Sequence, residues 1–163
     1  MKVERLILAS MMMIVMCSAD RGQLPTGIGT GTTERRSMVT LPDGFEVTVE
    51  VVANDETRAQ GLMFRESLAL DRGMIFLFPA PAEHAFWMKN TLIKLDMIWL
   101  ARDGTIRAIH SNAVPCQADP CRSYPPGVPA DAVLELAGGQ AQAHALAVGQ
   151  KLRLAGIDWA QAR

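Results

Sequence analysis

Residues 86–100 set polar side chains, among them Lys89, Asn90 and Asp96, within a run that is otherwise apolar and strand-forming. Side chains alternate along a strand, so Trp87 and Lys89 share one face and Asn90 takes the other. Burying a charge or an amide costs free energy unless a partner satisfies it. A chain that folds with this run in its interior must therefore either pair these residues internally or place them around a site.

Short apolar runs separated by turn signals recur along the chain from residue 38. Residues 45–52 alternate between apolar and polar, which is typical of a half-buried strand, whereas 74–78 are apolar throughout, as in a strand covered on both faces. The other predicted strands are 38–41, 84–90, 96–101, 105–112, 132–136 and 151–154, and short helices are predicted through 57–60 and 140–146. About seven short strands with two short helices predict an α+β, mainly β fold, a small closed or half-closed barrel.

The N-terminal residues have the features of an export signal. Lys2 and Arg5 precede the apolar run 6–16, which is too short to span a membrane comfortably, and Ala19 offers a small residue at a cleavage position. We therefore divide the chain into a signal peptide (1–19), a flexible Gly- and Thr-rich tether (20–37), a single β-rich domain (38–155) and a C-terminal tail (156–163).

Cys17 permits a second interpretation, in which a lipoprotein peptidase cuts before the cysteine and a lipid is attached. Met16 stands where a small residue is expected for that cleavage, and an uncleaved anchor is a third possibility. All three place the domain outside the cytoplasm. We predict a periplasmic or secreted protein, with membrane contact only through an N-terminal anchor if Cys17 carries a lipid.

The charge of the chain limits its partners. The chain holds 16 basic and 17 acidic residues, and removing residues 1–19 takes away Lys2, Arg5 and Glu4, which leaves 14 basic and 16 acidic ones. No basic block remains apart from residues 35–36. This composition predicts no binding to nucleic acid or to an anionic membrane surface.

Two cysteines, Cys116 and Cys121, lie in the mature chain. In an oxidising compartment two nearby cysteines usually pair, so we predict a disulfide that stabilises a short loop; a free or metal-binding pair is the alternative. The three histidines are scattered without metal-ligand spacing, and no phosphate-binding glycine motif follows a strand. The sequence predicts no metal and no cofactor.

Three further residues could carry chemistry. Arg65, at the end of the first helix, could hold a ligand carboxylate or phosphate, or pair with Asp96 or Glu135. Glu135 interrupts the apolar run 133–136, and the alternation indicates that it faces solvent or a barrel rim. An envelope hydrolase would need two of Asp96, Glu135 and His110 to converge in a cleft at about 5–10 Å.

Four segments together resemble one known family. They are Gly61-Leu62-Met63-Phe64-Arg65, Gly73-Met74-Ile75-Phe76, Phe86-Trp87-Met88-Lys89-Asn90-Thr91 with Leu95-Asp96, and Val133-Leu134-Glu135-Leu136. The chain is similar over about residues 38–155 to the bacterial and archaeal domain-of-unknown-function family numbered 192. The resemblance implies an exported or membrane-tethered, β-rich single domain and assigns no activity. Lys94 stands where such sequences often have proline.

These observations predict an exported accessory domain that binds a small polar ligand or an envelope partner. The expected site comprises Arg65, Trp87, Lys89, Asn90 and Asp96. The alternatives are the hydrolase and a structural assembly module, which would present an exposed apolar patch rather than a concave pocket.

Overall fold

The structure, a computed structural model, describes residues 36–163. The predicted signal peptide, Cys17 and nearly all of the predicted tether lie outside these residues. Among the described residues, no helix combines the length and the apolar character needed to cross a membrane.

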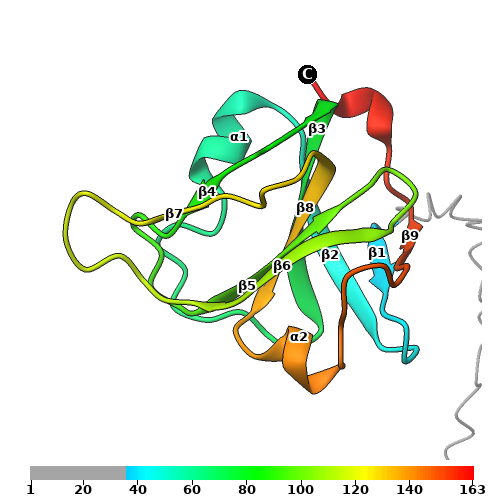
Figure 1. Ribbon diagram of the computed structural model, residues 1–163, viewed down its shortest axis with the longest axis horizontal. Coiled ribbons are helices and arrows are strands. Elements are labelled where there is room, and N and C mark those ends of the chain that lie inside the picture. The colour runs from blue at the N-terminus through cyan, green and yellow to red at the C-terminus, as the bar shows by residue number, and fades with distance from the viewer. Residues whose placement is uncertain (1–35) are drawn as a thin grey trace, which may run out of the picture. The chain divides into compact units, whose positions relative to one another are not determined.

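Seven strands form one sheet in the order β6-β5-β8-β3-β2-β1-β9 (Figure 1). Neighbouring strands are antiparallel apart from the parallel pair β2 and β3. Their bounds are β1 (Met38–Thr40), β2 (Glu46–Val52), β3 (Arg72–Ala82), β5 (Leu95–Leu100), β6 (Ile106–Ala113), β8 (Ala130–Ala137) and β9 (Arg153–Ala155). The predicted α+β, mainly β fold is confirmed.

The two outer strands, β6 and β9, meet at one end of the sheet. Just before them, Thr105 and Lys151 form an antiparallel bridge. The Ile106 N–H donates to the Gln150 carbonyl at 2.8 Å, and the Leu152 N–H donates to the Gly104 carbonyl at 2.9 Å. These bonds satisfy edge groups that would otherwise face solvent. The sheet is thus curled into a half-barrel, and its two outer strands contact each other through the residues just before β6 and β9.

Helix α1 (Asp55–Gln60) supplies the crossover between the parallel strands β2 and β3, because a parallel pair cannot be joined by a tight turn. The Asn54 side chain caps the helix by accepting the Thr57 N–H at 2.9 Å. Gly61, at a φ of 48°, ends it. Figure 1 shows α1 alongside the two-stranded sheet of β4 (Phe86–Trp87) and β7 (Ser123–Tyr124).

Both faces of the central strands are buried. The concave face carries one apolar cluster, which includes Val47, Ile75, Ile98 and Leu134. The other face carries a second cluster with Met74, Phe76, Met88, Met97, Trp99 and Val133. The prediction that 74–78 form a strand covered on both sides is therefore confirmed, and β5 and β8 share this environment.

Two short helices complete the fold. Helix α2 (Gln140–Ala143) follows β8, and the 3-10 helix η1 (Trp159–Gln161) follows β9. Residues 156–163, which we expected to form a tail, pack on the domain: Trp159 contacts the first apolar cluster, and the Arg102 guanidinium lies 5.0 Å from the centre of its ring. The Arg163 N–H donates to the Ala53 carbonyl at 2.9 Å.

Candidate functional site

Trp87 and Lys89 lie together at the surface, although the strand predicted over 84–90 covers only Phe86–Trp87 and Lys89 lies in the turn that follows it. Trp87 ends β4 with 52% of its surface exposed, and Lys89 Nζ lies 5.6 Å from the centre of its ring. Lys89 Nζ also lies 3.6 Å from a carboxylate oxygen of Asp119. Contacts of this kind at exposed positions contribute no more than about 1 kcal/mol each. Lys89 is therefore positioned beside Trp87 without being locked there.

Asn90 connects the segment 86–91 to the turn after α1. Asn90 has a φ of 54°, and Phe64 has a φ of 61°, which is uncommon for a bulky side chain. The Phe64 N–H donates to the Asn90 carbonyl at 2.8 Å, and Asn90 Nδ2 lies 3.8 Å from Met63 Sδ. Strained backbone of this kind persists only where the surroundings impose it. These contacts bring two of the segments identified from the sequence side by side.

Arg65 is paired inside the protein, with Glu50. Its two terminal nitrogens donate to the two Glu50 oxygens at 2.5 and 2.7 Å. The hydrogen bond from Arg65 holds the pKa of Glu50 below its usual value, and Glu50 raises the pKa of Arg65. The predicted partners Asp96 and Glu135 are therefore incorrect. The guanidinium of Arg65 is occupied, so we do not keep it in the candidate site.

Asp96 is also placed apart from Trp87 and Lys89. It is fully buried, and its carboxylate accepts the N–H groups of Asn112 at 2.7 Å, Gly139 at 3.0 Å and Ala141 at 2.6 Å. These bonds join β5 to the end of β6 and to the start of α2. A carboxylate satisfied in this way stabilises the fold and offers no free oxygen to a ligand.

Glu135 is the buried carboxyl that lacks a partner. It lies on β8 opposite Met74 of β3 and Met97 of β5, and only 4% of its surface is exposed. Among the described residues, no hydrogen bond or ion pair reaches its carboxyl oxygens, and no side-chain oxygen or nitrogen that is sealed from solvent lacks a partner, so the Glu135 carboxyl keeps a small contact with solvent. Burial raises its pKa to about 8, so the group is mostly protonated at neutral pH.

The prediction that Glu135 faces solvent or a rim is wrong. Its alternation with Leu134 and Leu136 is as expected, but the face opposite these residues is covered by the second apolar cluster. The signal that could have revealed this is the unbroken apolar character of 74–78 and 97–100, since strands of that kind are buried on both sides.

Glu135 lines a small cavity of about 30 Å³, large enough for a group the size of one water molecule. The walls come from α1 and the turn after it, from β3 and from the segment 86–91. The lining residues are Arg58, Ala59, Gln60, Gly61, Leu62, Met63, Phe76, Phe86, Trp87, Thr91 and Glu135. The cavity thus combines aromatic and apolar walls with one unpaired acid, the composition expected of a ligand site.

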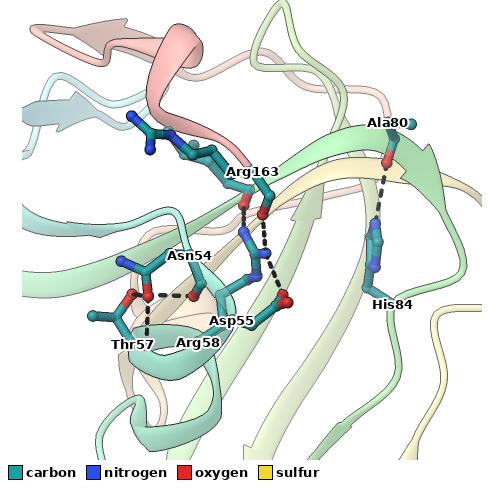
Figure 2. Close-up of polar contacts among 8 residues, drawn as sticks. Asn54, Asp55, Thr57, Arg58, Ala80, His84 and Arg163 are labelled. Atoms are coloured by element: carbon teal, nitrogen blue, oxygen red, sulfur yellow. Dashed lines mark hydrogen bonds and ion pairs between the residues drawn. The ribbon is translucent and has the colours of Figure 1, made fainter.

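A wider hollow of about 410 Å³ adjoins this cavity and shares Arg58, Ala59, Phe86 and Trp87 with it. Arg58 fixes its α1 wall, because its guanidinium donates to Asp55 at 2.7 Å, to the Leu77 carbonyl at 2.7 Å and to the Arg163 carbonyl (Figure 2). His84 stacks on Phe78 on the other side, and burial lowers its pKa. Trp87 therefore lines both the wider hollow and the cavity that Glu135 borders.

Two other hollows are as large but contain no comparable acid. One, of about 490 Å³, lies beside β9 and is lined by Lys151, which is paired with Asp103 at 3.0 Å. The other, of about 500 Å³, is lined mainly by the 114–124 loop. Volume alone does not identify a binding site, whereas a desolvated polar group without a partner does point to a ligand. We therefore take the Glu135 cavity as the candidate site.

The geometry argues against the paired-carboxyl hydrolase. Asp96 lies opposite Leu136 on β8, so its side chain and that of Glu135 point to opposite faces of the sheet. His110 lies on the same face of the sheet as Glu135, but Met97 of β5 pairs with both residues and so lies between them. The centres of the His110 and Tyr124 rings are 4.5 Å apart. No pair among the three acids and bases converges on a shared cleft.

Cys116 and Cys121 are joined by a disulfide, as predicted. With Asp119 they form a group whose donor atoms lie within 4.8 Å of one another. Metal ions bind the thiolate form of cysteine, so the disulfide leaves this group without its two sulfur ligands. Cys116 packs against the second apolar cluster, and its N–H donates to the Met88 carbonyl at 3.2 Å.

Comparison with known proteins identifies the family. The profile of the DUF192 family, described as uncharacterized, matches residues 38–154. The chain belongs to the DUF192 family. None of the curated proteins matches it at a significant level.

Two solved structures resemble this DUF192 domain. A Sinorhizobium meliloti 1021 protein, described provisionally as a transcription regulator, is 37% identical with a TM-score of 0.66, over 74% of this chain and 92% of that one. A Novosphingobium aromaticivorans DSM 12444 protein of unknown function is 36% identical with a TM-score of 0.65, over 72% of this chain and 83% of that one. Neither description assigns a ligand.

The segments that carry the DUF192 resemblance also build the candidate site. Each of the four contributes to the cavity wall: Gly61 to Met63 from the first, Phe76 from the second, Phe86, Trp87 and Thr91 from the third, and Glu135 from the fourth. These segments are far apart in the chain and meet only in the folded domain. The resemblance therefore marks the surroundings of one cavity.

Proposed function

We propose that this DUF192 domain is a ligand-binding module whose site is the cavity between α1 and β4, with Glu135 at its base and Trp87 at its mouth. The observation that carries the proposal is Glu135, a residue with 4% of its surface exposed, which borders the cavity and whose carboxyl has no partner among the described residues. Leaving such a group unpaired lowers stability, and a bound ligand that pairs with it would offset this cost.

The proposal keeps Trp87 and Lys89 from the predicted site and replaces Asp96 with Glu135. Trp87 offers a half-exposed ring at the mouth, and Lys89 lies over that ring. Aromatic side chains with one exposed face are common at the walls of small-molecule sites. We do not extend the description of the Sinorhizobium protein to this domain, because the chain has a net charge of −1 and no basic block in the matched region.

An NMR titration of the purified domain tests the proposal, using three probe classes: alkyl amines, neutral sugars and carboxylic acids. At least one class should shift the Trp87 indole signal together with the amide signals of Met63 and Thr91. The shifts of the Met63 and Thr91 amides should be lost in Trp87→Ala, and all three shifts should be kept in Lys151→Ala, a matched change in the hollow beside β9. If all three classes leave the signals unchanged, or shift only residues near Lys151, the proposal fails.

We also propose that the domain acts outside the cytoplasm. The export features of residues 1–19 support this, and the Cys116–Cys121 disulfide is of the kind that persists in oxidising compartments. Fractionation of cells that express the full chain, with a mass measurement of its N-terminus, tests the proposal. Cleavage after Ala19 or lipidation at Cys17 supports export, whereas an intact N-terminus in the cytoplasmic fraction contradicts it.

A further inference from the structure

We propose that the Glu135 cavity binds a primary ammonium group carried on a short apolar chain. The inference rests on the proposed function and specifies the class of ligand. Three properties of the cavity support it: the acidic group that its lining leaves unpaired, the aromatic character of its walls and its size.

The ionisable group that the lining leaves unpaired is an acid. Two ionisable side chains line the cavity, Arg58 and Glu135. The Arg58 side chain is 11% exposed, and its two terminal nitrogens donate to Asp55 and to the carbonyls of Leu77 and Arg163. Glu135 has no such partner among the described residues. The ionisable group of the lining that is available to pair with a ligand is therefore an acid. A cationic ligand complements it.

The walls favour a cation as well. Trp87, Phe76 and Phe86 line the cavity, and the faces of aromatic rings attract positive charge. Lys89 Nζ already lies 5.6 Å from the centre of the Trp87 ring, so this ring is one that accepts an ammonium group in the folded domain. The wider hollow beyond Phe86 and Trp87 offers space for the apolar chain of the ligand.

The size of the cavity selects among cations. A volume of about 30 Å³ accommodates a group similar to a water molecule. An –NH₃⁺ group meets this limit and brings three hydrogen-bond donors, whereas a quaternary ammonium is larger and brings none. A primary amine therefore fits both the volume and the free acceptors of the Glu135 carboxyl.

Binding should release a proton. Met74 and Met97 lie beside Glu135 on the neighbouring strands, and the other wall segments, the turn 61–63 and residues 86–91, contribute no charged group to the lining. Arg58 of α1 is the charged side chain that lines the cavity together with Glu135. When an ammonium group enters, the Glu135 O–H bond breaks, its proton passes to the buffer, and the carboxylate pairs with the ligand. Because burial holds the pKa at about 8, about one proton should be released near pH 7.

Isothermal titration calorimetry with n-butylammonium tests the inference, in two buffers of different ionisation enthalpy. We expect binding with a buffer-dependent heat that corresponds to about one proton released. The uncharged isostere n-butanol, and tetramethylammonium, should bind at least about tenfold more weakly. Glu135→Gln should weaken n-butylammonium binding about tenfold or more and abolish proton release. The matched control Glu66→Gln removes an exposed carboxyl outside the cavity and should change neither.

Carbon-13 NMR of the Glu135 carboxyl gives a readout in the unaltered protein. Its titration midpoint should fall when n-butylammonium is present and stay unchanged with n-butanol. If n-butanol or a sugar binds at Trp87 and n-butylammonium does not, the inference is wrong and the proposed function stands. If no probe of any class binds at the cavity, both fail.

Discussion

Asp96 and Glu135 lie diagonally across the β5–β8 pair and point to opposite faces of the sheet. Both carboxyls are buried, but Asp96 accepts three backbone N–H groups whereas none reaches Glu135 among the described residues. Two carboxyl residues on neighbouring strands, offset by one residue in the pairing, therefore play different parts in the domain. Asp96 holds strands and helix together, and Glu135 leaves a site open.

Replacing Asp96 with asparagine should destabilise the domain by about 2–4 kcal/mol, because hydrogen bonds to a carboxylate are strong and the new amide donor would face backbone N–H groups. Urea unfolding followed by circular dichroism measures the change. The control is Asp131→Asn, since Asp131 accepts a single N–H, from Arg102 at 3.0 Å, near the surface. Equal losses in the two variants would contradict the structural role of Asp96.

Glu135 should make stability depend on pH. Its pKa is about 8 in the folded domain against 4.5 when exposed, so the folded state retains a proton that the unfolded state loses. The contribution is fully present below about pH 4.5 and is lost as pH rises to about 8, by an amount on the order of 5 kcal/mol.

Unfolding free energies of the wild type and Glu135→Gln across this range test the prediction. The glutamine variant should be the more stable protein at pH values near 8, and the difference should shrink toward acid pH. Parallel pH profiles would show that Glu135 ionises equally in the folded and unfolded states.

The junction between β6 and β9 depends on Gly104. Gly104 has a φ of 87°, and a Cβ atom there would lie 2.2 Å from the Leu152 carbonyl oxygen. Gly44 has a φ of 91° but nothing within 4 Å of its would-be Cβ. Gly44→Ala should therefore cost about 1–2 kcal/mol from backbone strain alone, and Gly104→Ala about 3–5 kcal/mol because the backbone must also move.

Thermal unfolding of both glycine variants compares these costs, and amide exchange locates the effect. In Gly104→Ala, the amides of Ile106 and Leu152 should exchange faster, since their hydrogen bonds join the two edges. Similar melting temperatures for the two variants would mean that the backbone at the junction can move without a loss of stability.

Removing the disulfide should have a local effect. It closes a loop between residues five apart in sequence, so the double variant Cys116→Ser with Cys121→Ser should lose about 2 kcal/mol. Faster amide exchange should be confined to the 114–124 loop and its contact with Met88. Global unfolding of the double variant at room temperature would show that the loop matters for the whole domain.

Much of the fold follows from local patterns in the sequence. The alternation in 45–52, the apolar run 74–78 and the turn and cap residues predict the strands, α1 and the half-barrel, because burial on one or both faces leaves a period in the sequence. The pairing of Cys116 with Cys121 was expected from their proximity in a chain predicted to be exported, and it is present. Trp87 and Lys89 lie beside each other as expected, but Lys89 does so from a turn and not from the predicted strand.

The site required tertiary information. Alternation correctly placed Glu135 on the opposite face of the sheet from Leu134 and Leu136, but it does not say whether that face is exposed to solvent or buried. That depends on α1, β4 and β7, which come from other parts of the chain and pack over β3, β5 and β8. In the same way, only the fold brings Glu50 to Arg65 and three backbone amides to Asp96.

The sequence by itself determined which residues form strands and which segments are unusual, since these are properties of neighbours along the chain. The tertiary structure decided which buried acid is satisfied and which is free. The physical reason is that the cost of burying a charge depends on the partners around it, and those partners are assembled from distant segments.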